Sequence, residues 1–249
     1  MKVILCLALG LVVVVGGAWM WGAKTKASRQ QTADDIQRVK VKNEGLVRDR
    51  YREAIESAKE EGKKEVILPP GTDLPGPELS LEELLRDYGL LRVKVIDKET
   101  TVSEPYGDIK TWYKVEIVET LHHQSQMING ETPPFELPSR LIPLLPSESL
   151  LVVHGGVVNV DGVKVIRKAS TDGNHFIPKE EYLVIAYLDY GGKLIRPVTG
   201  RAGVFRINNG HIKSFGQKEH LLVREIEEIY GNDLDNLRSN MQLRLRRRK

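Results

Sequence analysis

The sequence predicts an α+β protein that is mainly β, and three observations carry this prediction. An uncharged apolar segment, Val3–Gly22, lies near the start, and a charged region with a helical repeat of apolar residues follows it. From Leu90 to Phe215, apolar residues alternate with polar ones or form short β-branched runs between turn dipeptides. After Gln217 the helical repeat returns. The expected order is a transmembrane or signal helix, an amphipathic stalk helix, an antiparallel β barrel or sandwich, and a C-terminal helical extension.

Residues 1–23 form the leader, which is either a signal-anchor or a signal peptide. Val3–Gly22 carries no charge, and at about 1.5 Å per residue it spans roughly 30 Å, the thickness of the hydrocarbon core of a bilayer. Gly16-Gly17-Ala18 offers small residues for cleavage, but the apolar run continues through Trp19-Met20-Trp21. We therefore favour a retained single-pass anchor in the cell membrane, with the lipid bilayer as partner through Val3 to Gly22. A cleaved leader would give a secreted protein.

The orientation of the body is predicted from charge and length. Lys24, Lys26 and Arg29 after the leader outnumber Lys2 before it, which favours a cytoplasmic body. Long domains translocate largely regardless of charge, so we expect an extracytoplasmic body. The one cysteine, Cys6, lies in the leader, and therefore no intramolecular disulfide and no cysteine-ligated zinc site can form.

Residues 28–64 predict an amphipathic helix. Apolar residues such as Val39, Leu46 and Ile55 recur at helical spacing among charged ones. We interpret this helix as a stalk between membrane and body, and self-association through it as a coiled coil is the alternative. Residues 65–78 are rich in Pro and Gly, which predicts a linker.

Residues 79–216 predict the antiparallel β domain. Ser80 caps a short helix over Leu81–Tyr88, and a half-buried strand with alternating side chains begins at Leu90. Tyr182–Leu188 is a continuous apolar run, as in a central strand covered on both faces. Two-residue turns between strands are predicted at Asp161-Gly162, Gly191-Gly192 and Asn209-Gly210. This spacing of turns favours a meander that closes, or nearly closes, as a small barrel or sandwich.

Two further segments complete the chain. Residues 131–148 contain five prolines and predict a loop inserted between strands, with a polyproline ligand as the alternative. Residues 217–249 predict a C-terminal helix that Gly231-Asn232 interrupts. The basic tail Arg244–Lys249 either contacts anionic lipid or another acidic surface, or is a solvated helix end.

Several segments of the β domain share a pattern with a known family. They are Ser80-Leu81-Glu82-Glu83-Leu84, Val115–Leu121, Gly155-Gly156, Phe176 followed by Lys179–Val184, and Gly203-Val204-Phe205. Together they resemble a small β domain of bacterial secreted and envelope proteins, a family without an assigned activity, over about residues 79–216. The resemblance implies an extracytoplasmic bacterial module and carries over no functional residue. The short Lys-Gly turn usual after the second strand is replaced here by His122-His123 and the proline-rich insertion.

No catalytic, cofactor-binding or metal-binding residue is predicted, because the reactive side chains form no recognisable motif. His122 and His123 are adjacent and point to opposite faces of a strand, so they cannot readily chelate one ion. His154-Gly155-Gly156 is typical of a turn at a strand end rather than of an oxyanion hole. Asp233-Leu234-Asp235-Asn236 lacks the glycine and later glutamate of a calcium loop. The consecutive pair Glu180-Glu181 predicts diverging, solvated carboxylates.

The absence of a recognisable motif, together with the anchor and the stalk, favours binding over catalysis. Hydrophobic residues make up 41% and charged residues 29% of the chain, which is sufficient for a packed core. The net charge of +3 is concentrated near the termini and aromatic residues are few, so no nucleic acid is expected. We expect a non-catalytic, membrane-anchored extracytoplasmic module that binds a protein partner or scaffolds an assembly, without a cofactor. An extracytoplasmic hydrolase without a recognisable motif and a cytoplasm-facing membrane adaptor are the alternatives.

Overall fold

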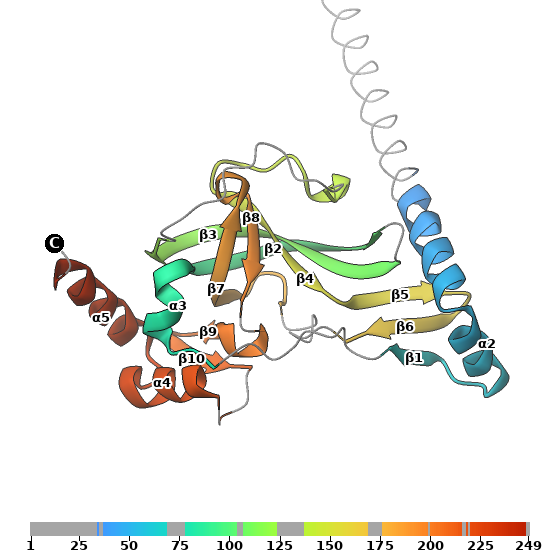
Figure 1. Cartoon of the computed structure of the whole chain (residues 1–249). Coiled ribbons are helices and arrows are strands. Elements are labelled where there is room, and N and C mark those ends of the chain that lie inside the picture. Colours follow the sequence, from blue (N-terminus) through green and yellow to red (C-terminus); the bar gives the residue numbers. More distant parts are fainter. Residues whose placement is uncertain are drawn as a thin grey trace, which may run out of the picture. The chain divides into compact units, whose positions relative to one another are not determined.

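The computed structural model describes residues 34, 37–68, 78–103, 107–123, 137–168, 176–198, 200–215, 218 and 220–247 (Figure 1). The chain divides into two units, Met1–Glu44 and Gly45–Lys249, and the second contains both sheets. The predicted leader over residues 1–23 lies outside the described residues. Among those that are described, no helix is both long and apolar enough to cross a membrane. The prediction of a mainly β protein with helices at its C-terminal end is confirmed.

The predicted helix over residues 28–64 differs from the observed one. Residues 45–50 are helical, the helix is interrupted at Tyr51, and α2 follows over Arg52–Glu60. A turn at Gly62, with φ of +67°, leads into β1, Glu65–Leu68. Residues 65–68 are therefore a strand and not part of a linker, because the β-branched Val66 and Ile67 pair with a neighbouring strand.

The small sheet has the strand order β1-β6-β5. β5, Gly156–Val160, and β6, Val163–Arg167, form the predicted hairpin through Asp161-Gly162, whose φ values are +50° and +85°. β1 pairs parallel to β6, which the prediction of an all-antiparallel domain missed. One face of this sheet packs against the preceding helical segment. The shared buried side chains are Val47, Ile55, Ala58, Leu68, Val158, Val160, Val163 and Val165.

The large sheet has the order β10-β9-β7-β2-β3-β4-β8. Its strands are β2 (Gly89–Ser103), β3 (Asp108–His122), β4 (Glu148–His154), β7 (Glu181–Asp189), β8 (Leu194–Pro197), β9 (Val204–Asn208) and β10 (His211–Ser214). β8 pairs in parallel with β4 and in antiparallel with β7, so the hydrogen-bonded pairs form a circuit β2-β3-β4-β8-β7. The parallel β4–β8 pair is a second departure from the predicted antiparallel arrangement.

Irregular pairing between β2 and β3 bends these two long strands. The register shifts between Leu90 and Leu91, between Arg92 and Val93, and between Val95 and Asp97. Such bulges raise the local twist and curve a sheet, which allows β8 to reach both β4 and β7. Another difference concerns Gly191-Gly192, where a 3-10 helix, η2 (Tyr190–Gly192), replaces the predicted two-residue turn. The predicted turn at Asn209-Gly210 joins β9 to β10 as expected.

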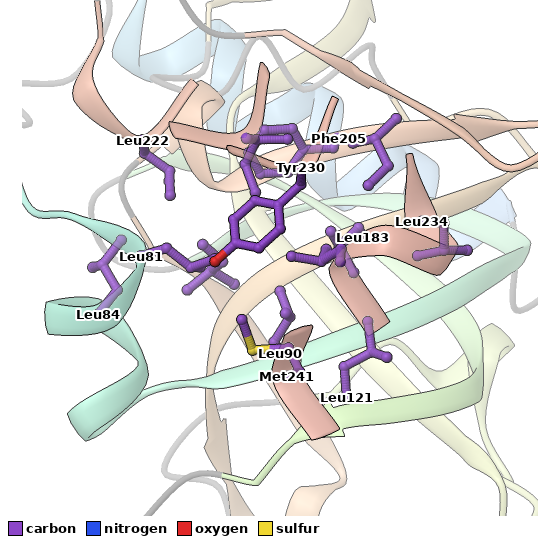
Figure 2. Close-up of a cluster of buried hydrophobic side chains, with 14 of the residues drawn as sticks. Leu81, Leu84, Leu90, Leu121, Leu183, Phe205, Leu222, Tyr230, Leu234 and Met241 are labelled. Atoms are coloured by element: carbon purple, nitrogen blue, oxygen red, sulfur yellow. The ribbon is translucent and has the colours of Figure 1, made fainter. Parts of the chain in front are cut away.

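Side chains of β7 confirm the prediction of a strand covered on both faces. Tyr182 and Val184 belong to a cluster with the inward residues of β2, β3 and β4. Leu183 and Ile185 belong to a second cluster on the opposite face. Figure 2 shows this second cluster, in which Leu81, Leu222, Tyr230 and Met241 come from the helices that cover the sheet.

Three helices supply that cover. The short helix α3, Leu81–Asp87, starts with a capping box in which Ser80 and Glu83 satisfy each other's backbone donors. α4, Leu221–Tyr230, ends at Gly231 in the left-handed conformation, as the sequence predicts, and α5 follows over Leu234–Arg247. The loop between α4 and α5 covers the outer edge of β10, because Ile212 N–H donates to Asn232 O at 2.8 Å and Leu234 N–H donates to Gly210 O at 2.9 Å.

Candidate interaction surface

The outer face of the small sheet carries a row of three apolar side chains, of which two are exposed and one, Ile166, is partly buried. Ile67 on β1 lies beside Ile166 on β6, and Ile166 lies beside Val157 on β5. Ile67 is 58% exposed and Val157 is 37% exposed. In a sheet with one buried face, polar side chains normally occupy the other face. These three residues therefore break the expected pattern and mark a candidate surface for a protein partner.

A polar row runs next to the apolar one. Glu65 on β1 lies beside Lys164 on β6, which lies beside Asn159 on β5. Lys164 Nζ is 3.3 Å from Glu65 Oε1, and both side chains are about half exposed. This exposed ion pair contributes little to folding, at most about 1 kcal/mol. The outer face therefore carries an apolar row and a polar row side by side.

β1 forms an edge of this sheet that stays open within the part of the chain that the structure describes, where β1 pairs only with β6 (Figure 1). Lys164 N–H donates to Lys64 O at 2.9 Å, which fixes the direction of the backbone groups in β1. Because these groups alternate along a strand, those of Val66 and Leu68 point to β6 and those of Glu65 and Ile67 point away. The edge thus offers two donors and two acceptors.

The tip of the β5–β6 hairpin is fixed to the helical segment by charge. Asp161 accepts hydrogen bonds from Arg48 Nη2 at 2.6 Å and from Lys59 Nζ at 3.1 Å. These hydrogen bonds, that from Arg48 first, hold the pKa of Asp161 below its usual value. The helix therefore sets the position of the small sheet both through its apolar side and through this hairpin tip.

The strand ends around Asp108 connect the small sheet to the large one. Arg167 at the end of β6 pairs with Asp108 at the start of β3, and His154 Nδ1 lies 3.6 Å from Asp108 Oδ2. Gly156, the first residue of β5, has no room for a side chain, because a Cβ there would lie 2.6 Å from Thr111 Oγ1. His154 ends β4 and Gly156 begins β5, so His154-Gly155-Gly156 joins two strands, and Thr111 Oγ1 donates to Gly155 O at 2.8 Å.

A second charged group joins α5 to the large sheet. Arg238 donates from Nε to Glu119 Oε1 at 2.7 Å and from Nη2 to Glu119 Oε2 at 2.8 Å. These bonds lower the pKa of Glu119 and raise that of Arg238. Arg92 pairs with Glu181 nearby, with Nη2 and Oε2 2.6 Å apart. Glu180 pairs instead with Arg206, so the two consecutive glutamates do diverge, but into ion pairs and not into free solvent.

Glu99 on β2 lies under the proline-rich segment. One turn of 3-10 helix, η1 (Ser139–Leu141), crosses here, and Arg140 Nη2 donates to Asp97 Oδ1 at 3.2 Å. Burial raises the pKa of Glu99, although Arg140 opposes this. Glu99 Oε2 is buried and accepts no hydrogen bond from the described residues. The predicted loop over residues 131–148 is packed in its described part, because Leu141 lies against Trp112, Leu150 and Leu194.

His220 and Asp233, the first residue of the calcium-loop candidate, make local structural contacts. His220 Nδ1 accepts the Leu222 N–H at 3.2 Å and caps α4. Asp233 Oδ1 accepts the Asn236 N–H at 2.8 Å at the start of α5. Within the described ranges no three His, Cys, Asp or Glu side chains are grouped as metal ligands. Sequence reasoning missed the outer face of the small sheet, because residues 65–68 were assigned to a linker.

Comparison with protein-family models gives no match for this chain, and no curated protein is significantly similar to it.

Proposed function

We propose that this protein is a membrane-anchored, extracytoplasmic module that binds a protein partner through the outer face of the small sheet. The single observation that carries the proposal is the apolar row of Ile67, Ile166 and Val157, in which Ile67 and Val157 are exposed, beside a strand edge that stays open within the described residues. Exposed apolar side chains grouped on a sheet face, next to unpaired backbone groups, are the features that peptide strands and other sheets recognise. The apolar leader Val3–Gly22 supports the membrane part of the proposal.

The fold of the large sheet is suited to supporting this surface rigidly. We propose that the circuit β2-β3-β4-β8-β7 is a small closed barrel, since each of its five strands pairs with two others of the circuit. Its interior is filled by side chains such as Leu91, Val93 and Tyr113. A filled barrel with ion pairs at its strand ends is a rigid support and leaves recognition to the attached small sheet.

A topology experiment tests the membrane part. The full chain is expressed with a C-terminal reporter that is active only outside the cytoplasm, and the cells are then fractionated. We expect reporter activity in the membrane pellet that withstands an alkaline wash. Activity in the soluble fraction would contradict a retained anchor, and an inactive reporter on a well-expressed membrane protein would contradict the extracytoplasmic orientation.

A further inference from the structure

The open edge of β1 points to a specific occupant of that edge. We infer that β1 pairs in antiparallel with β1 of a second copy of this chain, which joins the two small sheets into one sheet of six strands. The inference rests on the proposed function, because the dimer needs the membrane anchor and forms at the strand edge beside the proposed surface. It depends on three features of the edge, which are its hydrogen-bonding pattern, its side chains and its size.

The hydrogen-bonding pattern of the edge is self-complementary. The backbone groups of Glu65 and Ile67 point away from β6, as derived above from the Lys164–Lys64 hydrogen bond. A two-fold axis through Val66 places Glu65 of each copy opposite Ile67 of the other. Residues opposite each other at such positions exchange both of their backbone hydrogen bonds in an antiparallel pair, so all four outward groups of each strand are satisfied.

The side chains agree with this register. Each Glu65 meets an isoleucine and not the other Glu65, so like charges do not face each other across the new pair. The two Ile67 side chains become diagonal neighbours on the same face, within reach of each other. The apolar rows of Ile67, Ile166 and Val157 in the two copies then form one patch across the joined sheet.

An exposed isoleucine is unusual at the centre of an edge strand. Edge strands that remain single normally carry lysine, another charged residue or a proline at such a position. These residues prevent pairing with other chains. Ile67 is 58% exposed, while the other sheet edge at β10 is covered by the loop between α4 and α5. Within the described residues β1 and β5 are the two edges of the small sheet, and β1 carries the more exposed apolar side chain, since Ile67 is 58% exposed and Val157 on β5 is 37% exposed.

The size of the contact limits its strength and explains why a membrane would matter. β1 has four residues, far fewer than the roughly 20–30 residues per side of a stable soluble interface. Such a dimer needs a high local concentration, which confinement of anchored chains to one membrane provides. Isolated bodies in dilute solution are thus expected to be mainly monomeric.

Cysteine crosslinking in membranes tests the inference. In a Cys6→Ser background, Val66→Cys faces its counterpart as a non-hydrogen-bonded pair, where Cα atoms are about 4.5 Å apart and a disulfide can form. We expect oxidised membranes from cells expressing the full chain to give a band at twice the monomer mass. Asn159→Cys is the matched control, because it lies on β5, on the opposite side of the same sheet from β1, and is expected not to crosslink through a β1–β1 pair.

A second variant checks that the band depends on the edge. Ile67→Lys in the Val66→Cys background is expected to weaken the band several-fold without lowering the melting temperature, since this side chain is exposed. A Val66→Cys band no stronger than that of Asn159→Cys, or one unaffected by Ile67→Lys, would overturn the inference, as would a product joining Val66→Cys to a different protein. The fractionation separates the two proposals. A chain in the membrane pellet without the band contradicts only the dimer, whereas a chain in the soluble fraction contradicts the anchor and, with it, the membrane-dependent dimer inferred here.

Discussion

At the scale of single residues, Glu99 is the clearest case of a side chain that lowers stability. Its carboxylate is partly buried under Arg140, and one oxygen accepts no hydrogen bond from the described residues. Burial raises its pKa, so the folded protein binds the proton more tightly than the unfolded chain does. The neutral form therefore stabilises the fold, and this contribution is complete below the unfolded pKa and is lost as the pH rises through the folded pKa.

Glu99→Gln is expected to raise the free energy of unfolding at pH 7 by about 1 kcal/mol, because it removes the charge and keeps a hydrogen-bonding amide. The gain should shrink as the pH falls towards the usual glutamate pKa. Denaturant unfolding at several pH values measures both effects. Glu116→Gln, an exposed position on β3, is the matched control, and an equal response of the two variants would refute the role given to Glu99.

Gly156 is a position where neighbouring atoms leave no room for a side chain. Its Cβ would lie 2.6 Å from Thr111 Oγ1 and 3.1 Å from Thr100 Cγ2, at the point where β4 continues into β5. Gly156→Ala is expected to cost about 1–3 kcal/mol, as overpacking usually does. Gly45→Ala should instead stabilise by about 0.5–1 kcal/mol, because nothing lies near its Cβ and the residue is helical. Thermal melts that show the same sign for both variants would contradict this account.

At the scale of elements, the helical segment before β1 belongs to the body. Ile55 is 2% exposed and packs with the valines of the small sheet, so Ile55→Ala should cost about 2–4 kcal/mol. Glu56→Ala, one residue along the same helix and exposed, should stay within about 0.5 kcal/mol. Denaturant unfolding of the two variants compares them directly. Equal, small effects would mean that the segment is a free stalk, as the sequence pattern alone suggested.

The attachment of α5 has a different pH dependence. The hydrogen bonds from Arg238 lower the pKa of Glu119, so their contribution is present above the unfolded pKa and is lost as the pH falls through the folded pKa. A double-mutant cycle of Arg238→Ala and Glu119→Ala is expected to give a coupling energy of about 1–2 kcal/mol at pH 7. Repeating the cycle at a pH below the folded pKa should give a value close to zero. A coupling that does not change with pH would show that the contact is not ionic.

At the scale of the whole molecule, most strands could be predicted from the sequence, while their partners could not. The hairpins at Asp161-Gly162 and Asn209-Gly210 follow from turn chemistry, and β7 follows from its apolar run. The parallel pairs β1–β6 and β4–β8 join segments far apart in the chain, and no local pattern encodes such a pairing.

The candidate surface could not be predicted from the sequence for the same reason. Val66 and Ile67 stand next to a run of prolines and glycines, so their short β-branched stretch was assigned to a linker. Only the pairing with β6 turns them into a strand, and only that pairing places Ile67 beside Ile166 and Val157. An interaction surface composed of single residues from three strands leaves no motif in the sequence.

We propose that an anchored chain presents the outer face of the small sheet outside the cytoplasm. To test this, the Asn159→Cys variant is made in the Cys6→Ser background. It is then labelled in intact cells with a maleimide that cannot cross membranes. Asn159 is exposed on this face. We expect labelling before lysis, with the labelled chain in the membrane pellet. Labelling only after lysis would place the body in the cytoplasm and refute the proposal.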